Sequence, residues 1–176
     1  VYLLGAALHE VLTGTIRHQG ATLRAVLASA WLSDPIDYPA STPEELASLA
    51  NEATRSRPEE RLASAEAFKQ RIEVFLRHRQ ALELVEDVRV LSGGLRAIAP
   101  GEAVADEVEV LQRFDGCVAG LRRSLELWPM NAGAVGLLSD VLAWRVRHAL
   151  ANGDVLSAQS ALADLGRVAL RQAVDE

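Results

Sequence analysis

Apolar residues recur every three or four positions along most of this chain, which is the spacing of one face of an α-helix. The clearest stretch has apolar side chains at Leu111, Phe114, Val118, Leu121 and Leu125. The composition agrees, because 29 Ala and 27 Leu among 176 residues are strong helix formers, while aromatic residues make up only 5%. No alternating run of Val, Ile and Thr indicates a strand. The sequence therefore predicts an all-α fold.

The predicted helices cover residues 1–13, 21–31, 43–54, 65 to about 91, 104–128, 131–150 and 154–170. The helix from residue 65 is either one long helix or two helices with a bend near residues 78–80. Residues 1–13 are apolar on almost every side, which is typical of a helix that is buried all round. Residues 34–40 are expected to form a loop, because their two prolines disfavour a helical conformation in the residues before them.

The expected helix ends rest on residues that cap or stop helices. Gly14 is a typical C-cap, and Pro129 prevents the helix before it from continuing. Thr42, Pro43 and Glu45 match a capping box with proline at the first helical position. The side chains of Ser64, Asn131 and Asp154 are expected to be N-caps of the following helices.

The clearest linker lies between Gly93-Gly94 and Pro100-Gly101, so the boundary between two helical modules is expected between residues 78 and 101. The predicted organisation is a first module over residues 1–79, a connecting helix and linker over 80–101, and a second helical module over 102–176.

Several classes of protein are disfavoured by charge and composition. The net charge is −6 and no basic stripe is present, so nucleic acid is not expected as a partner. A single cysteine excludes an internal disulfide, no apolar run has the length of a membrane span, and no signal peptide is recognisable. A reducing, cytoplasmic location is expected. Met130 is the only methionine and the chain begins at Val1, so we expect a piece of a longer protein.

Motifs for catalysis, cofactors and metals were sought and not found. His9 and Glu10 begin a zinc-protease pattern, but Thr13 stands where the second histidine is needed. The other histidines occur singly, and no glycine-rich phosphate loop follows a strand. Cys117 is expected to be a small buried apolar residue. The acidic residues Glu102, Asp106, Glu107 and Glu109 are expected to form the solvated first turn of a helix. The sequence therefore predicts no catalytic, cofactor-binding or metal-binding residue.

The string V-Y-L-L-G-A-A-L-H-E-V-L-T-G at residues 1–14 resembles the central helix of the large lobe in bacterial serine/threonine protein kinases of the eukaryotic type. That family reads D-V-Y-S-L-G-x-x-L-Y-E-L-L-T-G. Residues 43–54 and 65–76 resemble the last helices of the lobe, and S-R-P-E-E-R-L-A-S between them is similar to the family's D-P-x-x-R-P-S/T. Leu62 replaces the usual proline and Arg57 the usual aspartate. The resemblance covers residues 1–79.

This resemblance implies that Arg61 is the structural arginine of the kinase lobe, which pairs with a glutamate at the end of the activation segment. It also implies a docking surface for proteins between residues 15 and 31, with Arg17, His18, Arg24 and Trp31 as candidates. The family's catalytic and nucleotide-binding motifs do not occur in this chain. ATP and magnesium are therefore implied for the parent kinase and not for this chain, which is expected to be inactive alone.

The string A-G-L-R-R-S-L-E-L-W-P-M-N-A at residues 119–132 is similar to the boundary between tetratricopeptide repeats. Ala158 and Ala161 are small residues where paired helices could pack closely. Antiparallel helical hairpins of the tetratricopeptide type are therefore expected after residue 101, although a plain helical hairpin explains the same residues. Such a module would bind proteins or peptides.

Two functions follow from this interpretation. In the first, the chain is the C-terminal portion of a bacterial serine/threonine protein kinase, in which it supports the lobe and binds proteins. In the second, it is a free-standing helical adaptor without an enzymatic parent. Partners would be the upstream lobe or other proteins, and self-association of the isolated chain is expected because apolar helix faces lack partners.

Overall fold

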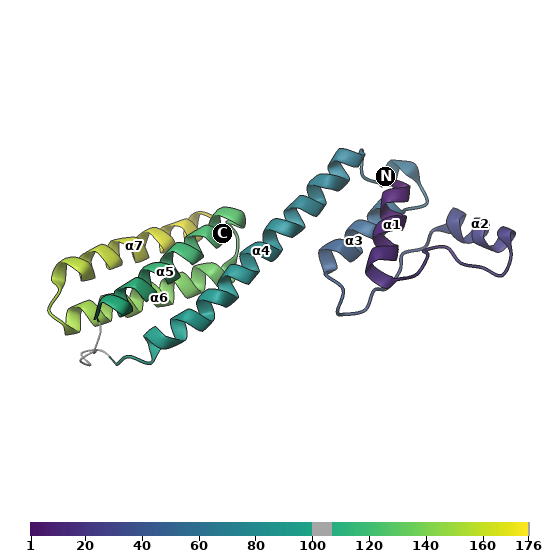
Figure 1. Ribbon diagram of the computed structural model, residues 1–176. Helices are drawn as coiled ribbons and strands as arrows, with labels where there is room; N and C mark the ends of the chain where they lie inside the picture. The colour runs from purple at the N-terminus through teal and green to yellow at the C-terminus, as the bar shows by residue number, and fades with distance from the viewer. Residues whose placement is uncertain (100–106, 176) are drawn as a thin grey trace. The chain divides into compact units, whose positions relative to one another are not determined.

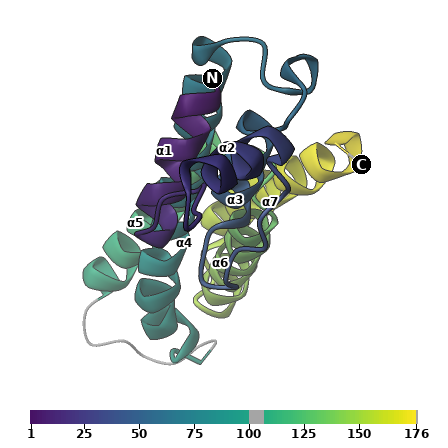
Figure 2. The same ribbon diagram turned by 90° about the vertical axis from the view of Figure 1, so that its right-hand side faces the viewer.

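The computed structural model describes residues 1–99 and 107–175, with side chains as far as residue 170 (Figures 1 and 2). This part of the chain contains seven α-helices and one short 3₁₀ helix and no strand, so the predicted all-α class is confirmed. The chain divides into two compact units, residues 1–76 and 77–176. The predicted features at Pro100, Gly101, Glu102, Val104 and Asp106 lie outside the described residues.

The first unit contains α1 (Tyr2–Thr13), α2 (Leu23–Leu32), α3 (Glu44–Ala53), the 3₁₀ helix η1 (Pro58–Glu60) and the start of α4 (Ala65–Arg96). Its core consists of Leu49, Ala53 and Phe68, which are at most 8% exposed. Helix α1 packs directly on α3 (Figure 1). A Cβ atom at Gly5 would lie 2.7 Å from the Ala53 Cβ atom, so glycine is needed for this close approach.

Helix α1 is not buried all round, contrary to the prediction from its apolar sequence. Leu3 and Val11 are 79% and 80% exposed, and only Gly5 and His9 are buried. The reason is that the apolar side chains surround the helix, whereas within the first unit α3 covers one face of it. The apolar pattern indicates how much of α1 can be buried. It does not indicate how much of the helix is covered by neighbours within this chain.

Most of the predicted helix ends in the first unit are found. Gly14 adopts the left-handed conformation with φ 71°, and the Ser64 hydroxyl accepts a hydrogen bond from the Ala67 amide at 3.0 Å. Residues 34–39 contain neither helix nor strand. The start of α3 differs by one residue, because Pro43 is the N-cap and Glu44 the first helical residue, which leaves Thr42 outside the cap position. Helix boundaries commonly differ from sequence-based expectations on this scale.

Helix α4 is a single helix of 32 residues, which decides between the two alternatives for this region. It includes Gly93 and Gly94, so the predicted linker does not begin there. Glycine costs a helix about 1 kcal/mol relative to alanine, but burial opposes this cost, since the neighbouring Leu95 and Ser92 are each 1% exposed. The Arg113 guanidinium also lies over Gly94, where a Cβ atom would overlap its Nη1 atom.

The second unit combines α4 from residue 77 with α5 (Glu107–Leu127), α6 (Ala132–Ala151) and α7 (Val155–Asp175). Helix α6 packs against both α5 and α7, and short connections make successive helices antiparallel (Figure 1). The core includes Val85, Val88 and Leu95 of α4, together with Leu121 of α5 and Leu142 of α6. The part of α4 after residue 79 is therefore part of this core as well as a connection.

A chain of buried polar groups joins three helices of the second unit. The Ser124 hydroxyl donates to the Ala81 carbonyl at 2.9 Å, and the Asn131 amide donates to the Ser124 oxygen at 3.3 Å. The Asn131 side-chain oxygen accepts from the Ala134 amide, so the predicted N-cap of α6 is confirmed. Since Asn131 is 2% exposed, water cannot replace these partners readily.

Three further predictions for this unit agree with the structure. Helix α5 ends at Leu127, before Pro129. The Asp154 carboxylate accepts from the Ser157 amide at 3.0 Å, as an N-cap of α7 should. Hydrogen bonding from the Ser157 side chain, and then from its amide, lowers the pKa of Asp154. Cys117 is fully buried, and burial raises the pKa of its thiol, which makes it unreactive in the folded unit.

Asn131→Ala should destabilise the second unit by about 2 kcal/mol, because it removes an N-cap and leaves buried polar groups without partners. Urea unfolding followed by circular dichroism measures this loss. The matched control is Gln112→Ala, which removes an exposed amide from α5 and should change stability by less than about 0.5 kcal/mol. Equal effects of the two substitutions would contradict the role given to Asn131.

Candidate interaction surface

Helix α2 presents an apolar face to solvent. Leu23, Leu27 and Trp31 are 76%, 61% and 83% exposed, and their spacing of four residues places them on one side of the helix. We call these three residues the α2 face. No residue of α2 is buried, and Arg24 is the only charged residue of the helix. Surface helices normally turn polar residues to solvent, so an apolar face of this kind is unusual.

The opposite side of α2 is attached by specific polar contacts. The Tyr2 hydroxyl donates to the Ala30 carbonyl at 3.3 Å, and the His18 Nδ1 atom lies 3.2 Å from the Ser29 hydroxyl. Buried Ser33, directly after the helix, has a left-handed backbone with φ 42°, and its hydroxyl donates to the Thr54 carbonyl. These hydrogen bonds tether α2 to Tyr2 of α1 and to Thr54 after α3, which gives its apolar face a defined position within the first unit.

Arg61, the predicted structural arginine, supports this attachment. Its Nε atom donates to the Arg55 carbonyl at 2.7 Å and its Nη2 atom to the Ser56 carbonyl at 3.0 Å. The guanidinium carbon lies 4.8 Å from the centre of the Tyr2 ring. Tyr2 in turn stacks on His18 and its hydroxyl lies 2.5 Å from the His18 Nε2 atom. Arg61, Tyr2 and His18 therefore form a continuous stack behind α2.

In the described part of the chain, no carboxylate lies within 4 Å of the Arg61 guanidinium. The ion pairs found there are formed by other residues. The described arginines that form ion pairs are Arg57, Arg71, Arg79, Arg89, Arg96, Arg113, Arg122, Arg123, Arg145 and Arg167. The glutamate partner implied by the kinase resemblance is thus not among the residues described, and Arg61 is held by backbone carbonyls and Tyr2.

Arg17 is one of the four predicted docking residues. It is only 7% exposed, so burial removes it from any surface that a partner could contact. Its Nη2 atom donates to the Asp34 carbonyl at 3.1 Å, and its guanidinium approaches the Asn51 side-chain oxygen at 3.5 Å. Asn51 also pairs with both backbone polar groups of Ile36. Arg17 and Asn51 therefore hold the loop after α2 against α3.

The charge of buried Arg17 acts on the neighbouring histidines. Burial and then the Arg17 charge lower the pKa values of both His9 and His18. The His9 Nδ1 atom lies 2.9 Å from the Tyr38 hydroxyl, and burial raises the pKa of Tyr38 despite the opposing effect of Arg17. All three groups are therefore favoured in their neutral forms, which suits structural hydrogen bonds better than acid or base catalysis.

The predicted docking residues thus separate into two groups. Arg24 and Trp31 are exposed on α2, whereas His18 lies behind the helix and Arg17 is buried. Leu23, Val26, Leu27 and Ala30 recur at helical spacing, but the structure exposes Leu23 and Leu27 and half-buries Val26 and Ala30. The sequence signal that could have found this surface is the near absence of charge along α2.

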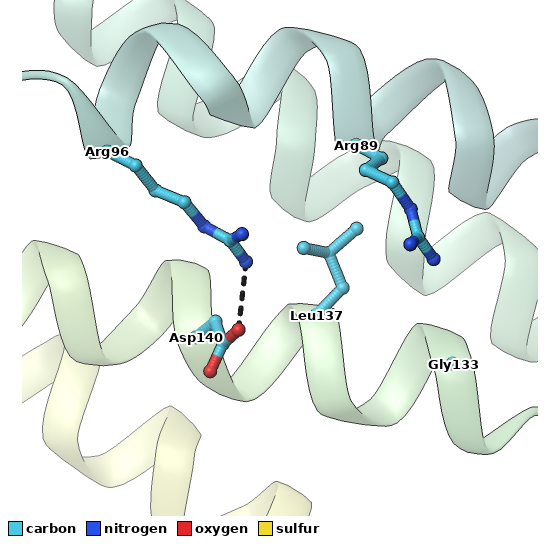
Figure 3. Close-up of a pocket in the computed structure, with 5 residues that line it drawn as sticks. All are labelled: Arg89, Arg96, Gly133, Leu137 and Asp140. Carbon is cyan, nitrogen blue, oxygen red and sulfur yellow. Dashed lines mark hydrogen bonds and ion pairs between the residues drawn. The ribbon is translucent and has the colours of Figure 1, made fainter.

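The second unit has a separate pocket of about 270 Å³ between α4 and α6 (Figure 3). It is lined by Arg89, Arg96, Gly133, Leu137 and Asp140. Arg96 forms an ion pair with Asp140 at 2.8 Å across the pocket, and Arg89 pairs with Glu86 at 3.3 Å. Because each arginine already has a carboxylate partner, the pocket offers no uncompensated positive charge to a ligand.

Among the residues described, no three His, Cys, Asp or Glu side chains gather closely enough to hold a metal ion. The helices in the described ranges also lack the combination of length and apolar content that would let one of them cross a membrane. Comparisons of the chain with known protein families, with curated proteins and with solved structures found no significant match.

Acidification should destabilise the first unit. His9 and His18 have lowered pKa values when folded, so the unfolded chain binds protons at a higher pH than the folded chain does. Their contribution to stability is complete above the ordinary histidine pKa of about 6.5 and is lost as the pH falls from there through the folded values.

Hydrogen exchange of peptides from residues 1–76 in moderate urea, at pH 7.5 and pH 5.5, measures this effect after correction for intrinsic exchange rates. The H9Q/H18Q double variant should show a smaller difference between the two pH values. The same pH dependence in wild type and variant would show that other groups cause it.

Proposed function

We propose that this chain is the C-terminal portion of a bacterial serine/threonine protein kinase, in which it supports the large lobe and binds protein partners. The observation that carries the binding role is the α2 face, which is apolar, exposed and attached from behind by Tyr2 and His18. Exposed apolar patches of this kind are typical of protein interaction sites. The parent protein would transfer phosphate from ATP to protein hydroxyls, with the catalytic residues supplied by its upstream part.

The support for a kinase lobe comes from α1 and Arg61. Residues 1–14 resemble the central helix of that lobe, which is buried in kinases, and here Leu3 and Val11 are about 80% exposed. A preceding part of the lobe would cover them. In the sequence resemblance Arg61 matches the family's structural arginine, and its Nη1 atom has no hydrogen-bond partner within the described part of the chain. A glutamate from an activation segment could bind there.

The kinase parentage is tested by sequencing the reading frame upstream of the Val1 codon. We expect an aspartate codon directly before Val1, preceded by a glycine-rich loop, the ATP-anchoring lysine, and the catalytic and magnesium-binding aspartates. The same lobe with those residues replaced would make the parent a catalytically inactive relative. A start codon close to Val1 would overturn the proposal in favour of a free-standing helical adaptor.

The α2 face is tested in the parent kinase with Leu27→Asp. Leu27 is 61% exposed, so the substitution should leave the fold intact. We expect the KM for a protein substrate or regulator that docks on α2 to rise about tenfold, as loss of one apolar anchor allows, while kcat and the KM for a short peptide stay unchanged.

The matched control is Val90→Asp, which places the same charge at an exposed position of α4. It should leave every kinetic constant unchanged. An equal loss toward short peptides in the Leu27→Asp variant would show damage to the catalytic lobe and would contradict a docking role.

A further inference from the structure

The loop between α3 and η1 carries an exposed serine between two arginines. Its sequence is Arg55-Ser56-Arg57, and all three residues are exposed to solvent. Ser56 belongs to neither α3 nor η1, so an enzyme can reach its hydroxyl without unfolding a helix. Exposed loops are where proteins commonly carry functional residues.

A third arginine reaches this serine from farther along the chain. The Arg61 Nη2 atom donates to the Ser56 carbonyl at 3.0 Å, and its Nε atom donates to the Arg55 carbonyl at 2.7 Å. These two bonds fix the guanidinium beside Ser56 and leave the Nη1 atom pointing to no partner among the described residues. The Arg55 side chain is fixed in a similar way, because its Nη1 atom donates to the Glu60 carbonyl at 3.1 Å.

In the described part of the chain, Arg55 and Arg61 form no ion pair with a carboxylate. Arg57 differs, because it pairs with Glu59 at 2.8 Å and with Glu60 at 3.5 Å. Arg57 therefore compensates the acidic residues of η1, whereas Arg55 and Arg61 are held by neutral carbonyls. Arginine binds anions with several oxygen atoms strongly, so the loop offers two positioned guanidinium groups to such an anion.

We propose that Ser56 is a phosphorylation site whose phosphate is bound by Arg55 and Arg61. A protein kinase that recognises basic residues beside its target would transfer the γ-phosphoryl group of ATP to the Ser56 Oγ atom, with release of ADP and of the hydroxyl proton. The Oγ atom and the carbonyl oxygen are each two bonds from Cα, so rotation about the Cα–Cβ bond brings a phosphate on Oγ to the Arg61 guanidinium. A phosphate opposite arginines forms charge-assisted hydrogen bonds that order a loop.

This site goes beyond the proposed function and does not depend on it, because it rests on residues 55–61 alone. A phosphate there would nevertheless act on the support of α2. The Arg61 guanidinium covers the Tyr2 ring, and the Tyr2 hydroxyl donates to the Ala30 carbonyl of α2. Fixing Arg61 more firmly therefore strengthens the contacts behind the α2 face. In the proposed kinase, the phosphate and the glutamate of the activation segment would compete for the Arg61 Nη1 atom.

Mass spectrometry of the intact parent protein, purified from growing and from resting cells of its natural source, tests the modification. A protease that cleaves after glutamate releases residues 53–59 as one peptide, and fragmentation separates Ser56 from buried Thr54. We expect phosphate on Ser56. Ser41 is the matched control, because it is an exposed loop serine without an adjacent arginine and should stay unmodified. Absence of phosphate from Ser56 in all samples would overturn the proposal.

A ³¹P nuclear magnetic resonance titration of the full chain phosphorylated at Ser56 tests the binding by arginine. The second pKa of phosphoserine is ordinarily about 6, and the two guanidinium groups should lower it to about 5.5, because positive charge favours the dianion. Arg61→Gln and Arg55→Gln should each raise this pKa toward the ordinary value. In the urea-unfolded chain the effect of Arg61→Gln should disappear, because the fold brings Arg61 to Ser56.

Arg147→Gln is the matched control, because it removes an exposed arginine of α6 and should leave the phosphate pKa unchanged. Arg55 bonds a single carbonyl, so its variant keeps the test valid if loss of Arg61 disturbs the loop. An ordinary phosphate pKa in the unsubstituted chain, no rise in either variant, or an equal rise with Arg147→Gln would each overturn the proposal. None of these results would change the upstream-sequence test of the proposed function.

Discussion

A helix can bury only the faces for which it has neighbours, and this constraint organises the whole protein. Helix α6 has neighbours on several sides, and its residues Leu138, Val141 and Leu142 are nearly inaccessible. Helices α1, α2 and α7 are apolar on faces that the described chain leaves in solvent. Because exposed apolar surface of this extent is unfavourable in water, such faces are where partners are to be expected.

The two units hold their helices by different means. In the second unit the helices share a large apolar core, and the polar chain through Ser124 and Asn131 lies inside it. In the first unit the core is small, and α2 and its following loop depend on hydrogen bonds from Tyr2, Arg17 and Asn51. A buried guanidinium bound to neutral groups is costly, so the first unit gains a well-defined position for α2 at the expense of stability.

The stack of Arg61, Tyr2 and His18 links the proposed lobe support to the proposed docking surface. Arg61 holds the carbonyls of the loop before α4 and covers Tyr2, while Tyr2 contacts both His18 and α2. A change at Arg61 would therefore reach the α2 face through direct contacts, although the two are distant in sequence. Energetic coupling between two sites requires a continuous physical connection of this kind. It also requires a structural element that can adopt two arrangements.

Local signals in the sequence determined much of this structure. Apolar spacing determined the all-α class, and side chains that bond the nearby backbone determined the helix starts at Ser64, Asn131 and Asp154, because such contacts involve residues only a few positions apart. Tertiary packing decided what local pattern cannot express. It kept Gly93 and Gly94 inside α4, buried Arg17, exposed Leu23 and Leu27, and left α1 covered on one face. Periodicity shows which side chains share a face, but burial depends on which neighbours the fold brings to that face.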